Sequence, residues 1–286
     1  MIVDSHQHFW NLERFDYPWM TDDLRTIRRN FGPKDLESLL AERGVDESVV
    51  VQAISSADET RYLLEIAART DFVSGVVGWV DLARPGVGTV VADLRNGVGG
   101  HHLVGVRHQV HDEDDRDWLL RHEVQHGLRE LADAGLAYDL LVRARELPAA
   151  LRTARAQPDL RLVIDHIAKP PIGEGEMEEW ARAMAPFAGL DNVYCKLSGM
   201  VTEADWNTWR PADLVPYVER VLDWFGEDRL MFGSDWPVCL LAASYGEVMD
   251  ALDSALGNVG ESARAKIYGG NAVAFYQLGD ARGVPR

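Results

Sequence analysis

The sequence has 286 residues, of which 47% are hydrophobic and 26% are charged, a composition that supports a buried core and excludes a disordered or collagen-like chain. Its 29 basic and 46 acidic residues give a net charge of −17, so neither nucleic acid nor an anionic membrane surface is expected as a partner. No apolar run approaches the ~20 residues of a membrane helix, and the amino terminus lacks the pattern of a signal peptide. We therefore expect a cytoplasmic protein.

Short apolar runs rich in β-forming residues alternate with segments of helical periodicity, the pattern of parallel strands joined by crossover helices. The expected strands are residues 2–8, 48–54, 72–80, 103–110, 137–142, 161–166, 192–197 and 230–234. Helices are expected to begin near Lys34, Asp58, Gly88, Trp118, Glu146, Met177, Asp213 and Ser244, with a last helix over residues 261–277. Eight such units without a flexible linker predict one domain over residues 1–286, a single (β/α)₈ barrel.

The active sites of such barrels lie at the carboxyl ends of the strands and in the loops that follow them. The polar or aromatic residues at these places are His6, His8, Gln52, Trp79, Asp81, Arg107, His108, His166, Lys169, Lys196, Ser198, Asp235 and Trp236. His6 and His8 are two residues apart on a strand, so both can point into the barrel mouth and bind a cation or a substrate oxygen. Asp235 can act as a general base on water, with a turn-capping role as the alternative. For His166 the alternative is a core histidine.

One motif points to a different chemistry. Residues 122–126, His-Glu-Val-Gln-His, match the helical zinc motif H-E-x-x-H. At ~100° per residue, Val124 and Leu128 belong to an apolar stripe, and His122 and His126 fall on nearly the opposite face. We therefore expect both histidines to be exposed on an outer helix, with no protease site there. The acidic run 112–117 is expected to be a solvated loop.

Other common sites are not expected. No glycine-rich phosphate loop follows a strand and no G-x-S-x-G elbow is present, which disfavours a nucleotide cofactor and a serine nucleophile. Cys195 and Cys239 lie in apolar stretches and are interpreted as reduced core thiols, too few for a disulfide framework.

Several motifs occur together in a fixed order: VDSHQHFW at 3–10, GVRH at 105–108, IDH at 164–166, KLSG at 196–199, TEADW at 202–206 and FGSDWP at 232–237. Together they resemble the amidohydrolase superfamily, and more narrowly its sugar lactonase branch. The resemblance implies a distorted barrel with His6, His8, His166 and Asp235 gathered at the mouth. A binuclear metal centre is not expected, because strand four shows no evident bridging lysine and strand five shows no further histidine. The resemblance leaves two possibilities open. Either one divalent ion, with zinc favoured, is held by some of His6, His8, His166 and Asp235, or hydrolysis proceeds without a metal.

The leading hypothesis is a hydrolase that opens a sugar-acid lactone, such as L-fuconolactone or L-rhamnonolactone, to the aldonic acid. Asp235 is the expected general base, and His6, His8 and His166 the other catalytic residues. The expected substrate contacts are Trp10, Gln52, Trp79, Arg107, His108, Lys169 and Trp236. The alternative is a metal-dependent decarboxylase of an unsaturated carboxylic acid on the same fold, and a non-catalytic binding protein is disfavoured because Asp235 and the histidines are all present. The partner is a small-molecule sugar lactone, and the chain is expected to be a monomer or a homodimer.

Overall fold

A parallel sheet of eight strands in sequential order forms the centre of the computed structural model, which describes residues 1–279. The strands are β1 (Val3–Gln7), β2 (Glu47–Val51), β3 (Val73–Gly78), β4 (Leu103–His108), β5 (Ala137–Leu140), β6 (Leu162–Ile164), β7 (Val193–Leu197) and β8 (Leu230–Phe232). All seven consecutive pairs are parallel. Every strand overlaps an expected one, and all eight are shorter than expected.

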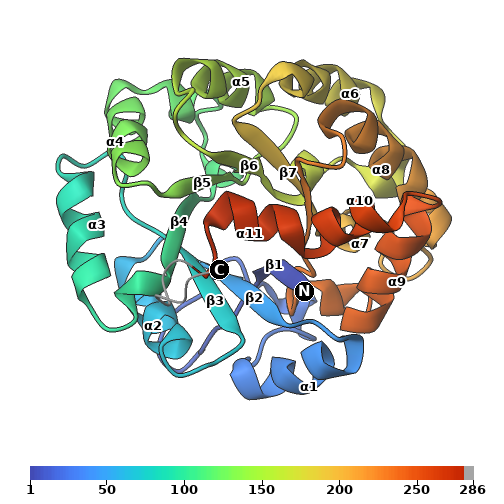
Figure 1. Cartoon of the computed structure of the whole chain (residues 1–286), viewed down its shortest axis with the longest axis horizontal. Helices are drawn as coiled ribbons and strands as arrows, with labels where there is room; N and C mark the ends of the chain where they lie inside the picture. The colour runs from blue at the N-terminus through green and yellow to red at the C-terminus, as the bar shows by residue number, and fades with distance from the viewer. Residues whose placement is uncertain (280–286) are drawn as a thin grey trace.

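Helices form a ring around this sheet, as Figure 1 shows in a view along the barrel. They are α1 (Pro33–Arg43), α2 (Ala57–Ala67), α3 (Val87–Asn96), α4 (His122–Asp133), α5 (Leu147–Ala156), α6 (Glu178–Met184), α7 (Met200–Glu203), α8 (Pro211–Phe225), α9 (Tyr245–Leu256), α10 (Glu261–Ala265) and α11 (Asn271–Tyr276). The side chains of Ser56 and Ser244 cap α2 and α9 by accepting hydrogen bonds from backbone N–H groups of the first turn. The expected (β/α)₈ barrel is confirmed. None of the helices within residues 1–279 is long and apolar enough to cross a lipid bilayer.

Helix α4 carries the H-E-x-x-H motif. Its apolar stripe, which includes Val124 and Leu128, is buried, and His122 and His126 are exposed, as expected. The helix begins at His122 rather than near Trp118, because residues 118–120 form a separate 3₁₀ turn. The two histidines therefore lie on the outside of the barrel.

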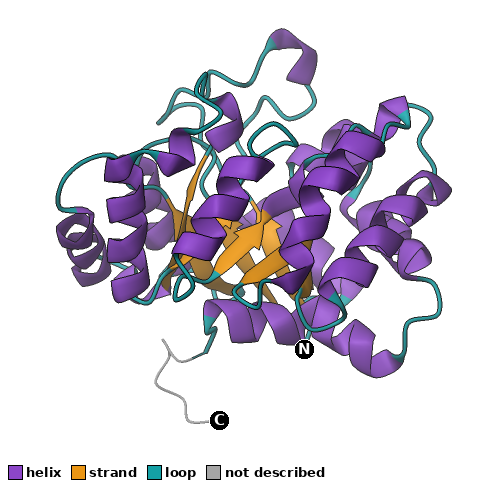
Figure 2. Ribbon diagram, turned by 90° about the horizontal axis from the view of Figure 1, so that it is seen from above, coloured by secondary structure: helices purple, strands orange, loops and turns teal. Residues whose placement is uncertain are grey.

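The expected last helix, residues 261–277, is divided by a π-helical segment, Lys266–Gly270. This segment packs closely on the start of the chain, since a Cβ added to Gly269 would lie 2.3 Å from the Met1 carbonyl oxygen. The helix that follows, α11, lies across one opening of the barrel (Figure 1), where Phe275 packs with inward valines of the strands. Figure 2 shows that α11 and the N-terminus are on one side of the barrel and long loops on the other.

The barrel closes between β1 and β8, and a buried carboxylate holds this seam. The backbone N–H of Asp235 donates to the His6 carbonyl at 2.8 Å. Asp4, with 0% of its surface exposed, accepts hydrogen bonds from the backbone N–H of His6 at 3.1 Å and of Ser234 at 2.9 Å. It also accepts from the hydroxyls of Ser234 at 2.6 Å and Tyr245 at 3.1 Å. Burial raises the pKa of Asp4 to about 6, although these donors oppose the rise.

Replacing Asp4 with alanine should lower the free energy of unfolding by about 3 kcal/mol or more, because several buried donors lose their acceptor at ~1–3 kcal/mol each. Asp46→Ala is the matched control, since Asp46 also accepts a backbone hydrogen bond near the start of β1 but is exposed. That control should lose less than about 1 kcal/mol. Urea unfolding at pH 7 measures both. Equal losses would contradict a special role for Asp4 at the seam.

Candidate functional site

Four residues that the sequence places at the barrel mouth meet in the structure. The Asp235 Oδ1 atom lies 3.3 Å from His8 Nε2, 3.7 Å from His6 Nε2 and 3.9 Å from His166 Nε2. The two Nε2 atoms of His6 and His8 are 3.2 Å apart. All four side chains are buried. They come from β1 and from the segments that follow β1, β6 and β8, so the shared end of the parallel strands brings them together.

The backbone is strained where it presents two of these residues. His166 has a φ of 53° and Asp235 a φ of 56°, both in the left-handed region, and the three residues after His166 share it. This conformation costs a non-glycine residue roughly 1–2 kcal/mol, and such strain is concentrated at functional sites. Two glycines make room for the imidazoles. A Cβ would lie 2.5 Å from His166 Nδ1 if added to Gly199, and 2.7 Å from His6 Cβ if added to Gly233.

Hydrogen bonds orient the rings of His8 and His166, and burial disfavours the charged forms of His6 and His166. The His8 Nδ1 atom lies 2.7 Å from the Val51 carbonyl oxygen, which can only accept, so Nδ1 carries a proton. The His166 Nδ1 atom lies 2.9 Å from the Ser198 hydroxyl. Burial holds the pKa of both His6 and His166 well below the ordinary value of 6.5. These side chains are therefore neutral near pH 7.

The Asp235 carboxylate remains ionised in this setting. Burial by itself raises the pKa of Asp235, but nearby His166, His8 and Lys169 together hold it below the ordinary value. An ionised carboxylate beside imidazole nitrogens can take a proton from water or bind a cation.

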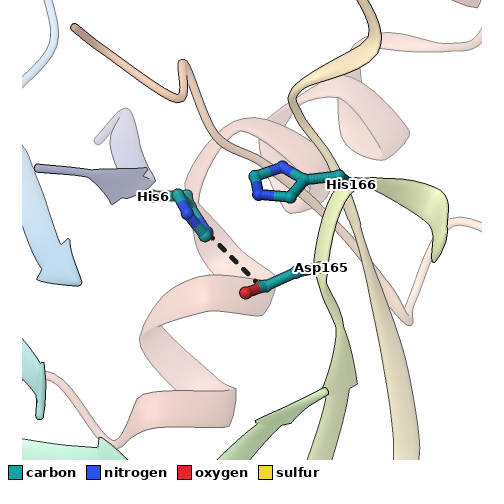
Figure 3. A group of neighbouring side chains, drawn as sticks. All are labelled: His6, Asp165 and His166. Atoms are coloured by element: carbon teal, nitrogen blue, oxygen red, sulfur yellow. Dashed lines mark ion pairs between the residues drawn. The ribbon is translucent and has the colours of Figure 1, made fainter. Parts of the chain in front are cut away.

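A buried ionic network lies beneath the histidines. The Lys196 Nζ atom is 2.6 Å from Asp139 Oδ2 and 3.0 Å from Asp165 Oδ1. Asp165 Oδ2 accepts a hydrogen bond from Arg107 Nη1 at 3.0 Å, and Figure 3 shows Asp165 facing His6. Although burial opposes ionisation, Lys196, His6 and Arg107 hold the pKa of Asp165 well below its ordinary value. The sequence analysis did not select the two aspartates, although a carboxylate within or directly after a short apolar strand is a usable signal.

The donor atoms at the barrel mouth have the spacing of the ligands of a divalent ion. Tetrahedral zinc ligands at ~2.0–2.1 Å from the metal lie roughly 3.3 Å from one another. The spacings between donor atoms and Asp235 Oδ1 range from 3.3 to 3.9 Å, close to this value. The potential ligand atoms of His6, His8 and Asp235 all lie within 4.8 Å of one another. The same holds for those of His6, Asp165 and His166. These residues fit a single divalent ion.

A pocket of about 180 Å³ opens above Asp235. It is smaller than the roughly 300 Å³ at which pockets for drug-sized ligands begin, so it suits a ligand of one ring. The predicted residues among its lining are His8, Arg107, His166, Lys169 and Asp235, and the others are Trp19, Ala53, Gln109, His111, Asp112, Leu141 and Val238. The strand-end criterion missed these others because most lie in loops. Gln109 and His111 directly follow β4 and could have been found by extending the search.

The structure does not place the remaining five predicted substrate contacts on this lining, namely Trp10, Gln52, Trp79, His108 and Trp236. Trp10 and Trp236 are each 1% exposed and pack edge-on against Phe31. The indole N–H of Trp10 donates to the Arg29 carbonyl at 2.7 Å. These two tryptophans therefore belong to the core beside the site, and Trp19 supplies an aromatic side chain to the pocket.

The other three have partners within the protein. The Trp79 indole N–H donates to His108 Nδ1 at 3.0 Å, and His108 Nε2 lies 2.8 Å from Glu113 Oε1. Gln52 Oε1 accepts from Arg107 Nη2 at 3.0 Å, which orients the guanidinium. These contacts also correct the expectation that residues 112–117 are simply a solvated loop, because Glu113 is bonded and Asp112 lines the pocket.

Comparisons with known proteins agree with this geometry. The family model described as amidohydrolase matches residues 3–278. An L-fucono-1,5-lactonase from Burkholderia ambifaria is 43% identical over 286 aligned positions, covering 96% of this chain and 95% of that protein. The crystal structure of an amidohydrolase from Burkholderia multivorans with bound zinc is 38% identical, with a TM-score of 0.91 over 97% of this chain and 99% of that one. A dihydroxybenzoic acid decarboxylase from a Polaromonas species, 14% identical with a TM-score of 0.63 over 96% of each chain, shares the fold alone.

A buried glutamate holds one wall of the pocket. Glu59 Oε2 accepts hydrogen bonds from the backbone N–H of Ala53 at 2.9 Å and of Ile54 at 3.0 Å, in the loop after β2. The Ala53 carbonyl in turn accepts from the Trp19 indole N–H at 2.9 Å and the Gln109 amide at 3.1 Å. Burial raises the pKa of Glu59 to about 7.

Because this pKa is raised above the ordinary value of 4.5, the folded protein binds the proton more tightly than the unfolded chain. The stability from this group is complete below pH ~4 and is lost as the pH rises through about 7. Glu59→Gln keeps an acceptor oxygen and does not ionise. The free energy of unfolding of the variant minus that of wild type should therefore increase by about 2 kcal/mol when the pH is raised from 5 to 8. Urea unfolding at the two pH values measures this, and a difference that does not change with pH would refute the assignment.

Proposed function

The chain belongs to the amidohydrolase family, and from this premise we propose that it hydrolyses the lactone of a sugar acid to the open-chain aldonic acid. One observation carries the proposal. The ionised Asp235 carboxylate lies beside His8 and His166 at the floor of a pocket that suits one ring. It does so in a chain that aligns over 96% of its length with an L-fucono-1,5-lactonase. L-fuconolactone and L-rhamnonolactone are the proposed substrates.

Asp235 is the general base of the proposed reaction. Its carboxylate takes a proton from a water molecule, and the water oxygen attacks the carbonyl carbon of the ring. The bond between that carbon and the ring oxygen then breaks, and the proton passes from Asp235 to the departing oxygen. The product carries a new carboxyl group and a new hydroxyl group, so atoms and charge balance without a co-reactant.

The carbonyl oxygen gains negative charge as water attacks, and Arg107 is the fixed cation nearest the site. Arg107 lines the pocket, and its Nη1 atom lies 3.2 Å from His6 Nε2. The contacts with Asp165 and Gln52 hold the guanidinium before substrate arrives. Preorganised donors of this kind stabilise an oxyanion at no cost of reorganisation during the reaction. Lys169, paired with Glu203, is the other lining residue with a permanent positive charge.

Zinc is the divalent ion that we propose for the site. His6, His8 and Asp235 would hold it, with His166 within reach. A bound ion supplies a Lewis acid that polarises a carbonyl oxygen. The zinc-bound relative supports this choice of metal.

The decarboxylase alternative receives less support. An unsaturated acid needs cations to hold its carboxylates. Of the described residues that line the pocket, Arg107 and Lys169 are the permanent cations, and Glu203 already pairs with Lys169. A neutral lactone fits this balance better, and the decarboxylase relative is similar in fold alone.

Asp235→Asn should reduce kcat for L-fuconolactone by about 10² to 10⁴, because general base catalysis contributes that much. Binding should change little, since the amide has the same shape. Acid release followed with a pH indicator measures the rates, and Asp46→Asn at an exposed position is the matched control, expected to keep full activity. Undiminished turnover by folded Asp235→Asn would rule out this carboxylate as the base.

Zinc binding is tested without any substrate. After treatment with a chelator, the protein should bind one Zn²⁺ per chain in a calorimetric titration. His8→Gln should weaken binding by about tenfold or more, because it removes one of the imidazole ligands. His126→Gln on the exposed face of α4 is the control and should leave the affinity unchanged. Equal affinities in the two variants would show that zinc binds elsewhere.

A further inference from the structure

Lys169 is a pocket cation whose charge is offset by a carboxylate that does not line the pocket. The Lys169 side chain is part of the pocket lining, and its ammonium group forms an ion pair with Glu203 Oε1 at the end of α7. Both side chains are largely buried, with 16% of Lys169 and 13% of Glu203 exposed. Solvent therefore screens this pair less than it screens an ion pair on the open surface.

The Glu203 carboxylate has a cation at each of its oxygens. Its second oxygen, Oε2, lies 3.5 Å from Arg143 Nη1. The Arg143 side chain is 51% exposed and is not part of the pocket lining, so water screens its charge. Helix α7 begins directly after Gly199, the glycine that makes room for the His166 ring. The chain after β7 thus brings Glu203 to Lys169, which follows His166 by three residues.

The proposed reaction changes the charge of the molecule in the pocket. A sugar lactone is uncharged, whereas the aldonic acid has a carboxyl group that is ionised at pH 7, because the ordinary pKa of such a group is about 4. An ammonium group without a partner would bind that carboxylate through a charge-assisted hydrogen bond. Arg107, the other permanent cation among the described lining residues, already donates to Asp165 Oδ2 at 3.0 Å. The charge balance at Lys169 therefore bears directly on how firmly the pocket holds an anion.

We propose that Glu203 is a positioning residue that makes the pocket selective for uncharged ligands, because it occupies Lys169 and so disfavours the binding of carboxylates. Lys169 can still donate to a hydroxyl or a ring oxygen, since an ammonium group has three donors and the ion pair uses one of them. The pocket therefore accepts a neutral lactone, rejects a lactone that bears a carboxylate, and releases the aldonate product. The inference rests on the proposed function, but its tests measure binding alone, so the two can fail separately.

Binding of L-fuconate, the acid that the proposed reaction forms from L-fuconolactone, measures the effect. The full-length wild-type protein and Glu203→Gln are treated with a chelator and titrated calorimetrically with L-fuconate at pH 7 and low salt. Glu203→Gln keeps the length of the side chain and an acceptor oxygen but removes the charge, so L-fuconate should bind about tenfold more tightly or better than it binds wild type. Glu227→Gln, at a surface ion pair with Lys266, is the matched control and should leave the affinity unchanged.

Two further measurements separate an effect of charge from a change of shape. L-fuconamide, the uncharged amide of the same acid, should bind wild type and Glu203→Gln equally, and it should bind wild type at least as tightly as L-fuconate does. Lys169→Met combined with Glu203→Gln should lose the gain for L-fuconate, because the unpaired ammonium group is then absent while Arg143 is kept.

The proposal is overturned if L-fuconate binds Glu203→Gln no more tightly than wild type, a result that includes no detectable binding to either protein. An equal gain for the amide, or a gain that persists in the double variant, would also overturn it. If Glu203→Gln does not fold, a wild-type preference for the acid over the amide would overturn it, and the opposite preference would support it. A gain confined to the acid and dependent on Lys169 supports the proposal even if wild type releases no acid from any lactone.

Discussion

The arrangement of the site depends on the buried Asp4 carboxylate, which joins the first strand of the barrel to the last. It accepts hydrogen bonds from the backbone of His6, a proposed site residue, and of Ser234, which directly precedes the proposed base Asp235. The seam and the site are therefore one structure. The backbone bond from Asp235 to His6 then sets the distance between base and imidazole. A closed barrel is needed here for chemistry as well as for stability, because an open seam would separate the two halves of the site.

Charge is distributed unevenly in this acidic protein. The chain carries a net charge of −17, yet Lys196 and Arg107 are buried beneath the pocket, where they balance Asp165. Burial and these cations keep His6 neutral, and the surroundings of Asp235 keep it ionised. An ionised Asp235 carboxylate, a neutral His6 imidazole and a fixed guanidinium thus coexist near neutral pH. Hydrolysis of an uncharged ester needs this combination, because the base must be free of its proton while a cation awaits the developing oxyanion.

The strands and the four central residues could be predicted from the sequence, because apolar runs mark buried parallel strands and the ends of such strands meet at one edge. Side-chain direction could not be predicted in the same way. A register shift between Asp4 and Gln7 interrupts the alternation of β1, and the left-handed backbone of Asp235 changes the direction of the chain before Trp236. The pocket residue Trp19 lies in a loop, where periodicity carries no information. Asp165 was passed over although it stands beside His166 in the sequence.

Acid release by the wild-type protein tests the central claim most directly. Freshly prepared 1,4- and 1,5-lactones of six-carbon deoxy sugars are supplied with a pH indicator, before and after treatment with a chelator and after zinc is restored. We predict enzymatic acid release from at least one of these lactones, with the chelator and zinc arms showing whether an ion takes part. No acid release from any lactone, under any of the three conditions, would contradict the account.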